Sequence, residues 1–228
     1  MQIASASGRT LRTYVARPIE GNASRAVLVL HENRGLTSWE QELGDRLASA
    51  GFLVLAPDML SERGPKGGGS DTFDSAAAAR EAIHALAAEQ ILADLDAAVT
   101  IAEEQLPSAR KVVVAGFGWG GSQAFRYAAH NPRLAAVVNF YGAAPHEEQL
   151  SQLQVPVFAF YGELDGITAD VPRLKSRLKT LAKDFLPVTY GGASHGFMRT
   201  GKAPDAGPAD RKAHDDAWVR FAELLATL

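Results

Sequence analysis

Residues 112–121 read Val-Val-Val-Ala-Gly-Phe-Gly-Trp-Gly-Gly. The apolar, β-branched start predicts a strand, the glycines predict a turn, and residues 121–129 are compatible with a helix. Strand, turn and helix in this order form the context of the nucleophile elbow, G-x-S-x-G, whose central residue is held in a strained conformation between small neighbours. Gly116 and Gly120 fit the small positions. The central position is Gly118, so the pattern is present without a nucleophilic side chain.

A second interpretation of the same glycines is a phosphate-binding loop. Gly116, Gly118 and Gly121 satisfy G-x-G-x-x-G between a strand and a helix. That fingerprint normally belongs to the first βα unit and is followed, about 20 residues on, by an acidic residue. Here it lies in the middle of the chain, and the next apolar run, residues 135–141, ends in tyrosine. These features disfavour a nucleotide site.

Composition restricts the class of protein. The chain has 228 residues, of which 46% are hydrophobic and 21% charged, with a net charge of −3 and no cysteine. These values fit one domain over residues 1–228 and exclude disulfides and thiolate metal sites. The acidic balance argues against nucleic-acid binding. The start of the sequence has no signal-peptide pattern and no run is long enough to cross a membrane, so we expect a cytoplasmic protein.

Apolar runs alternate with helix-like segments along the chain. The expected strands are residues 26–30, 52–56, 112–115, 135–141, 155–161 and 186–190. The expected helices are residues 38–50, 74–105 with a break, 121–130, 169–182 and 210–228. This alternation predicts an α/β fold with a mainly parallel sheet covered by helices on both faces. Residues 1–16 are expected to form a hairpin, with residues 10–16 as an edge strand. Residues 61–70 predict a flexible surface loop, with a lid over a pocket as the alternative.

Two polar residues follow later strands. Asp165 lies in Gly-Glu-Leu-Asp after the run 157–161, and His195 lies in Gly-Gly-Ala-Ser-His-Gly-Phe after the run 186–190. The carboxyl ends of parallel strands meet at one edge of the sheet, where ligands bind. The order elbow, aspartate, histidine is that of a catalytic triad on such a scaffold. Each residue alone has a plain structural explanation, but together they predict a base and the acid that orients it.

The loop after the first core strand, His31-Glu32-Asn33-Arg34-Gly35, adds a further element. In enzymes built around a nucleophile elbow, this loop supplies one backbone N–H of the oxyanion hole and the residue after the nucleophile supplies the other. Asn33 and Trp119 are therefore the candidate donors. Glu32 needs a partner or solvent at such a strand end, and Arg34 is the structural alternative.

These segments together resemble the dienelactone hydrolases, α/β-hydrolases with a Cys-His-Asp triad. The resemblance covers nearly the whole chain and rests on residues 31–35, 116–121, 162–166 and 194–197. It implies a single-domain α/β-hydrolase that hydrolyses a small ester or enol lactone carrying a carboxylate. By resemblance Gly118 stands at the cysteine position, His195 is the base, Asp165 its orienting acid, and Glu32 the carboxylate that pairs with the thiol.

Two arginines match the family's task of holding a substrate carboxylate, for which a planar guanidinium is suited. Arg199 lies four residues after His195 and matches the family pattern; Arg80 is a looser match, with an ordinary surface charge as its alternative. The partner we expect is a small ester or lactone, with the chain a monomer or weak homodimer. No metal or organic cofactor is implied, because the other histidines lack a second ligand at metal spacing.

The glycine at position 118 leaves the activity open. A thiol route is closed, and hydrolysis would then depend on a water activated by His195. Ser122 is the nearest hydroxyl, but we expect its side chain to point away from the elbow. The alternative function is a non-catalytic binder of small carboxylates, which the absence of turnover would distinguish.

Overall fold

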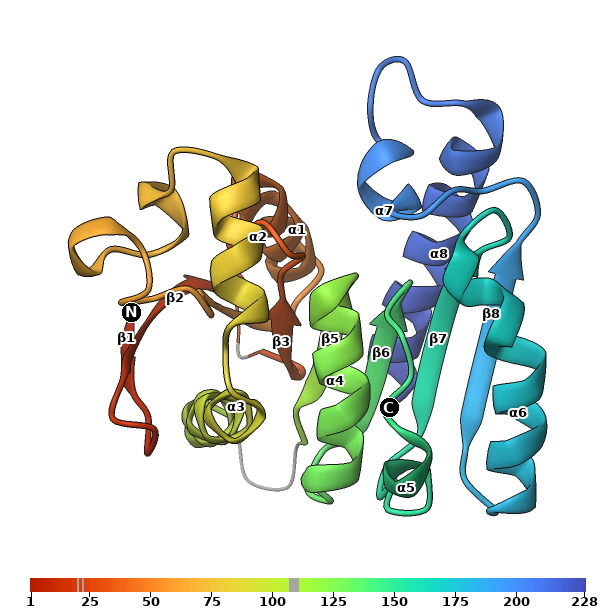
Figure 1. The fold of residues 1–228 in the computed structure, drawn as a ribbon, viewed down its shortest axis with the longest axis horizontal. Coiled ribbons are helices and arrows are strands. Elements are labelled where there is room, and N and C mark those ends of the chain that lie inside the picture. Colours follow the sequence, from red (N-terminus) through yellow and green to blue (C-terminus); the bar gives the residue numbers. More distant parts are fainter. Residues whose placement is uncertain (20, 22, 107–110) are drawn as a thin grey trace. The chain divides into compact units, whose positions relative to one another are not determined.

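The computed structural model describes residues 1–19, 21, 23–106 and 111–228 of the chain. They form two compact units, Met1–Val114 and Ala115–Leu228. Each unit combines strands with flanking helices, as Figure 1 shows, so the α/β class predicted from the sequence is confirmed. Strand β5 (Val113–Phe117) passes from the first unit into the second. The assignment of one domain to residues 1–228 stays a prediction.

The strands of the first unit follow the order β1-β2-β4-β3. Their bounds are β1 Gln2–Ala4, β2 Thr10–Ala16, β3 Ala26–Leu30 and β4 Leu53–Pro57. β1 and β2 pair antiparallel, which confirms the N-terminal hairpin, and β3 pairs with β4 in parallel. The expectation that residues 10–16 form an edge strand is wrong, because β2 also pairs antiparallel with β4. The alternation of apolar and polar residues along β2 shows that the two faces of the strand differ in burial. It does not show whether the strand pairs on one edge or on both.

Three helices accompany these strands: α1 (Ser38–Ser49), α2 (Ala76–His84) and α3 (Ala88–Glu104). The break expected within residues 74–105 therefore falls at 85–87. Thr37 and Glu40 form a reciprocal capping box that fixes where α1 begins. α3 is tied to the N-terminal hairpin by a buried ion pair, in which Arg9 Nη1 lies 3.1 Å from Asp94 Oδ2. Burial lowers the pKa of Arg9, although Asp94 opposes the shift.

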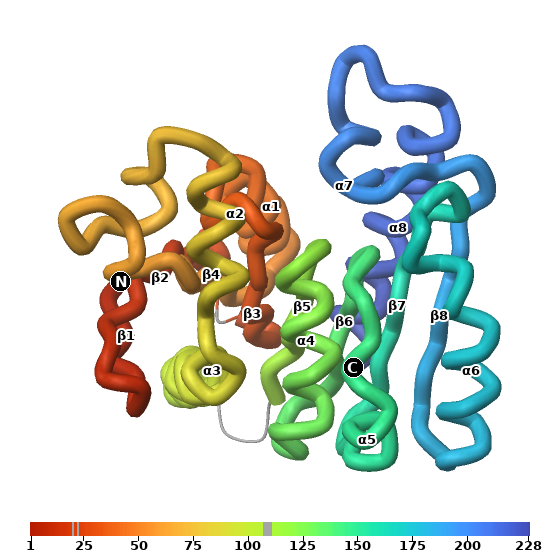
Figure 2. Tube along the Cα trace, in the orientation of Figure 1, coloured from red at the N-terminus to blue at the C-terminus, as the bar shows by residue number. Residues whose placement is uncertain are grey.

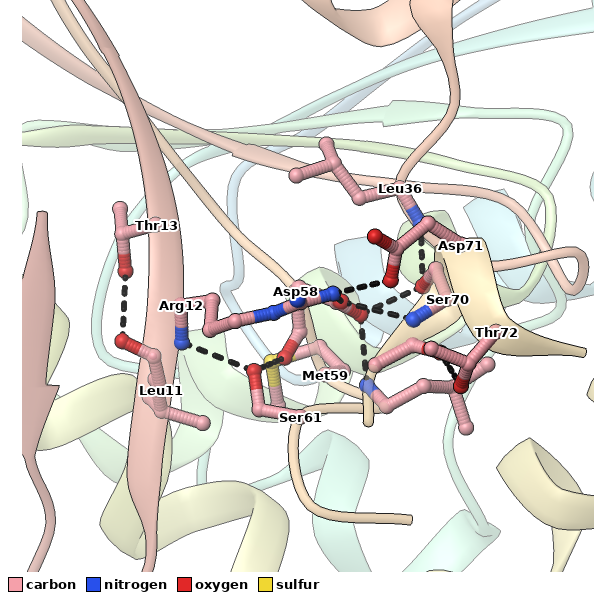
Figure 3. A network of polar contacts seen from close by, with 12 residues as sticks. Leu11, Arg12, Thr13, Leu36, Asp58, Met59, Ser61, Ser70, Asp71 and Thr72 are labelled. Atoms are coloured by element: carbon pink, nitrogen blue, oxygen red, sulfur yellow. Dashed lines mark hydrogen bonds and ion pairs between the residues drawn. The ribbon is translucent and has the colours of Figure 1, made fainter. Parts of the chain in front are cut away.

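Residues 61–70 are anchored at their start and end, as Figure 3 shows. Asp58, at the end of β4, is only 3% exposed and accepts hydrogen bonds from the backbone N–H groups of Leu60 and Ser70 at 3.0 and 2.8 Å. Arg12 of β2 lies 3.6 Å from the same carboxylate and also binds Asp71. The segment that the sequence suggests is flexible is therefore held at both ends by one buried acid.

The strands of the second unit follow the order β5-β6-β7-β8. The bounds of the last three are β6 Ala136–Phe140, β7 Val157–Gly162 and β8 Phe185–Tyr190, and β7 is parallel to both neighbours. Side chains alternate along β7: Phe158 and Phe160 line a groove with α8 (Pro208–Thr227), while Tyr161 lies against α6 (Val171–Thr180). Figures 1 and 2 show α4 (Trp119–His130) and α6 on one face of these strands and α8 on the other. The prediction of helices on both faces is thus confirmed for this unit.

Helix boundaries differ from the predicted ones for local reasons. α4 begins at Trp119, two residues before the predicted start, because its glycines adopt helical geometry despite their low propensity. The helix expected over residues 169–182 is a 3-10 helix, η3 (Gly166–Asp170), followed by α6. Pro172 occupies the first turn of α6, where the missing N–H of proline has no helical acceptor to lose. Two four-residue helices, α5 (Glu147–Leu150) and α7 (Phe197–Thr200), were not predicted. Within the described residues, no helix is both long and apolar enough to cross a membrane.

Candidate active site

The elbow lies where β5 gives way to α4. Gly118 has φ 52° and ψ −114°, far from the conformations that residues with a Cβ adopt readily. Its N–H donates to Phe140 O at 3.0 Å and its carbonyl accepts from Ser122 N at 3.0 Å, so the turn is held from both sides. A strained turn of this kind presents the nucleophile in the elbow motif, and the assignment of Gly118 to that position stays a prediction.

Close packing around the turn excludes larger side chains at its neighbours. A Cβ placed on Gly116 would lie 2.1 Å from Gly120 O, and one on Gly121 would lie 2.4 Å from Asn139 Oδ1. A Cβ on Gly142, at the end of the adjacent strand, would lie 2.3 Å from Ser122 N. All three approaches are shorter than real Cβ contacts. The glycines beside position 118 are therefore required by the fold of the elbow itself.

His195 and Asp165 meet at the carboxyl ends of β7 and β8. His195 Nδ1 lies 2.6 Å from Asp165 Oδ2, and the Asp165 side chain is 7% exposed against 53% for His195. The other carboxylate oxygen, Oδ1, accepts from Ile167 N at 3.1 Å and caps η3. An ionised carboxylate at this distance holds the imidazole with its proton on Nδ1, which leaves Nε2 to accept a proton. The arrangement is that of a base with an orienting acid.

The loop that carries His195 is anchored to α8. Asp210, in the first turn of that helix, accepts from Ser194 N at 2.7 Å and from the Ser194 hydroxyl at 2.6 Å. It also accepts from the Thr200 hydroxyl at 2.7 Å. One carboxylate therefore binds the chain both before His195 and after Arg199. Burial alone would raise the pKa of Asp210, but the hydrogen bonds from Ser194 and Thr200 outweigh it and place the pKa below its ordinary value.

Tyr141 supports the other side of the histidine. Its ring is fully buried and meets the His195 ring edge-on, with centroids 5.1 Å apart, and meets Phe197 in the same manner at 5.3 Å. Its backbone has φ 43°, an unfavourable value for a residue with a side chain, which also explains why β6 ends at Phe140, before the predicted end. Strained residues of this kind concentrate at functional sites, where surrounding contacts enforce them.

The remaining candidates of this unit lie on the same loops and helices. Trp119 is the first residue of α4, where backbone N–H groups point out of the helix and can bind an oxyanion. Arg199 lies in α7 and is partly exposed. The Ser122 hydroxyl accepts from Ala143 N at 2.8 Å and lies 3.4 Å from Gly118 O. The expectation that this side chain points away from the elbow is therefore wrong, because the hydroxyl bonds back to the carbonyl of the residue four positions earlier, Gly118.

Glu32, Asn33 and Arg80 belong to the first unit. Glu32 is 6% exposed, its N–H points at the Glu40 carboxylate 3.4 Å away, and Asn33 is partly exposed beside it. Arg80 lies exposed on α2. Their roles at the site stay predictions. His31, the first residue of the same loop, is fully buried; its Nε2 accepts from Met59 N at 3.0 Å and its Nδ1 lies 2.7 Å from Glu32 O.

The other histidines show no grouping that would hold a metal. His84, His130 and His146 are exposed, and His214 is buried with Nδ1 2.8 Å from Met198 O. Across the described ranges, no three His, Cys, Asp or Glu side chains gather in a way that could bind an ion.

Tyr141 and Asp210 are the two supporting residues that the sequence analysis missed. The position of Tyr141, directly before Gly142 at a strand end, is a signal that it reaches the ligand-binding edge of the sheet. Asp210 follows Gly207-Pro208, a helix start at which an acidic residue is expected, but nothing in the sequence identifies Ser194 and Thr200 as its partners.

Comparison with known proteins points to one family. The model of the "Dienelactone hydrolase family" matches residues 11–228. A protein of Methylorubrum extorquens named "Putative carboxymethylenebutenolidase" is 30% identical over 92% of this chain and 74% of its own length. A protein of Escherichia coli O157:H7 with the same name is 27% identical over 95% of this chain and 82% of its own length.

A solved structure shows the same fold. The crystal structure of a "Putative Dienelactone Hydrolase" from Klebsiella pneumoniae covers 100% of this chain and 97% of its own, with a TM-score of 0.85 and 27% identity. The family match extends over nearly all of the sequence and includes the elbow, the aspartate and the histidine. The chain therefore belongs to the dienelactone hydrolase family.

Proposed function

We propose that this protein hydrolyses a small ester or enol lactone that carries a carboxylate, with His195 as the base and Asp165 as its orienting acid. The observation that carries the proposal is the 2.6 Å contact between a buried Asp165 and a half-exposed His195. A buried acid beside an accessible imidazole is the arrangement that general-base catalysis needs. Membership of a hydrolase family supports this function over a non-catalytic carboxylate binder.

With glycine at position 118, the attacking group is a water molecule. His195 Nε2 takes one proton from the water while its oxygen bonds to the substrate carbonyl carbon, and Asp165 stabilises the imidazolium that forms. The Trp119 N–H donates to the oxyanion. The bond to the leaving alkoxide then breaks, the proton passes from Nε2 to that alkoxide, and a carboxylic acid and an alcohol result. No covalent intermediate forms on the chain.

This route is slower than nucleophilic catalysis. Enzymes of this kind that lose their nucleophile retain an acceleration of roughly 10³–10⁴ over water from oxyanion stabilisation and binding. We therefore expect weak turnover in the chain with glycine at position 118. The Gly118→Cys variant restores the family's thiol, and we expect its turnover to exceed that of the parent by at least about 10²-fold.

The test measures hydrolysis of enol lactones and activated aryl esters by the parent, by His195→Ala and by Gly118→Cys. Parent turnover that disappears in His195→Ala supports the water route. A parent equal to His195→Ala, with an active Gly118→Cys, would refute the water route and mean that the site is intact but inactive with glycine at position 118. If neither the parent nor Gly118→Cys exceeds His195→Ala on any substrate, the proposed hydrolase is wrong.

Arg199 is proposed to hold the substrate carboxylate. A lysine keeps the charge but loses the planar, two-point contact of a guanidinium. In the Gly118→Cys background, Arg199→Lys should raise KM about tenfold for a carboxylate-bearing ester and leave KM for its neutral methyl-ester counterpart nearly constant. Equal changes for both substrates would remove Arg199 from carboxylate recognition.

A further inference from the structure

A cavity of about 410 Å³ lies within the second unit, between α5, η3 and α6. Its volume is that of sites which take small organic molecules. Much of its wall is apolar and comes from Ala144, Pro145, Leu150, Ile167, Val171 and Leu174. Tyr161, at the end of β7, lines it as well and is 1% exposed.

The hydroxyl group of Tyr161 has a hydrogen to donate. Asn139 and Gly142 exchange two hydrogen bonds, from Gly142 N to Asn139 Oδ1 and from Asn139 Nδ2 to Gly142 O, both at 2.9 Å. These bonds fix the orientation of the Asn139 amide, so its Nδ2 is the donor in the 3.1 Å contact with the Tyr161 hydroxyl. The phenol oxygen therefore acts as an acceptor, and no acceptor for its own hydrogen is found among the described residues.

Burial keeps this phenol protonated. It raises the pKa of Tyr161, and the nearby Asp165 carboxylate acts in the same direction. A buried hydroxyl that lacks an acceptor is unfavourable, and a ligand oxygen in the cavity would supply one. The ligand that fits this wall is thus apolar over most of its surface and carries one oxygen acceptor.

The charges at the rim argue against an ionic ligand. Arg173 binds Asp170 through Nε at 2.6 Å and lies 3.7 Å from Glu147. Arg177 also binds Glu147. The Arg173 guanidinium, which lines the cavity, is thus already paired with the carboxylates of Asp170 and Glu147. It therefore offers no excess positive charge to an anionic ligand. An uncharged ligand meets no such obstacle.

The cavity adjoins the acid of the catalytic pair through one turn. Gly166 and Ile167, which line it, directly follow Asp165, and the Ile167 N–H donates to Asp165 Oδ1 at 3.1 Å. Ala143, which also lines the cavity, comes two residues after the Tyr141 whose ring packs against His195. A group bound here is therefore held next to the residues that we assign to catalysis.

We propose that this cavity is the subsite for the uncharged alcohol part of the ester, with Tyr161 donating a hydrogen bond to an oxygen of that part. The use in catalysis rests on the proposed hydrolase function, whereas the binding of uncharged oxygen-bearing molecules does not. The subsite is separate from the role proposed for Arg199, so acid and alcohol parts are recognised by different chemistry.

Binding is tested on the parent chain with acetophenone, an aromatic ketone that esterases do not hydrolyse. ¹³C-methyl NMR of Ile167, Val171 and Leu174 should show saturable shifts with acetophenone. Ethylbenzene, which lacks the oxygen, and benzoate, which is charged, should each bind more weakly. Shifts that are absent, or confined to methyl groups elsewhere, would overturn the proposal.

Two variants test the role of the phenol. Tyr161→Phe should weaken acetophenone binding about fivefold, the equivalent of one neutral hydrogen bond. Tyr190→Phe is the matched control, because it removes a phenol of the same unit whose hydroxyl donates to Asp216 at 2.9 Å, outside the cavity. Its acetophenone affinity should equal that of the parent. Equal affinity in Tyr161→Phe and the parent would refute the hydrogen bond.

A variant that fills the cavity tests whether binding in the cavity contributes to ester hydrolysis. In the Gly118→Cys background, Ala144→Phe should raise the ratio of KM values for a phenethyl ester and the methyl ester of the same acid about fivefold. An unchanged ratio would overturn the alcohol subsite. If acetophenone binds as expected but Gly118→Cys hydrolyses nothing, the failure lies in the proposed hydrolase and the cavity remains a binding site for uncharged molecules.

Discussion

Replacing Gly118 by alanine should destabilise the protein, although replacing glycine by alanine is usually stabilising. At positions whose backbone conformation both residues can adopt, the exchange stabilises by about 0.4–1 kcal/mol, because alanine restricts the unfolded chain. Gly118 has φ 52° and ψ −114°, where a side chain costs about 1–3 kcal/mol. After the stabilising effect of alanine on the unfolded chain is subtracted, we expect the free energy of unfolding to fall by up to about 2.6 kcal/mol, with a midpoint of about 1.3 kcal/mol. For a chain of this size, the midpoint corresponds to a fall in melting temperature of about 3–5 °C.

The assay is urea unfolding followed by circular dichroism, with Gly166→Ala as the matched control. A Cβ on Gly166 would meet no atom within 4 Å and its φ is outside the positive range, so that exchange should leave the stability equal or slightly higher. A Gly118→Ala variant as stable as the parent would show that the elbow is relaxed in solution. Gly118→Cys should show the same loss of stability as Gly118→Ala, together with its gain in turnover.

Two further predictions concern carboxylates other than that of Asp165. Asp94→Asn leaves Arg9 buried without its counter-charge and should lower the free energy of unfolding, measured in urea, by about 3–5 kcal/mol. Asp71→Asn removes an exposed ion pair and should change the free energy of unfolding by less than about 1 kcal/mol. Similar losses in the two variants would refute the difference that we expect between a buried and an exposed ion pair. Asp210 has a folded pKa below its unfolded value of about 3.9, so it stabilises the fold above that pH and loses this contribution as pH falls through 4 and below. The stability of Asp210→Asn should therefore decline less steeply between pH 5 and pH 2 than that of the parent, and parallel slopes would contradict the assignment.

The sequence predicts the pairing of Asp165 with His195 better than the contacts that surround the two residues. Asp165 and His195 follow strands, and strand ends are visible as apolar runs that stop at glycine, so the juxtaposition of the two residues follows from topology alone. The hydrogen bonds from Ser194 and Thr200 to Asp210 join residues up to 16 positions apart in the chain. All three residue types are common on protein surfaces. Nothing local distinguishes such a contact from solvent exposure.

Short elements were unpredictable for a related reason. α5 and α7 have four residues each, about one turn, in which no helical period can be recognised. The φ of 43° at Tyr141 is enforced by packing against His195 and Phe197, not by the preference of tyrosine. The edge position of β1, a strand of three residues, depends on pairing that its length does not reveal. Periodicity thus identifies long elements, while contacts between them decide the short ones.

The crowded glycines of the elbow have a consequence for how this protein can change. Positions 116, 121 and 142 admit no side chain, whereas position 118 is where the motif carries its reactive group. A glycine codon that ends in U or C becomes a cysteine or serine codon through one base change. Where the gene carries such a codon, a single transition or transversion restores a hydroxyl or a thiol at this position. Inactivity acquired there would be reversible for as long as the neighbouring glycines persist.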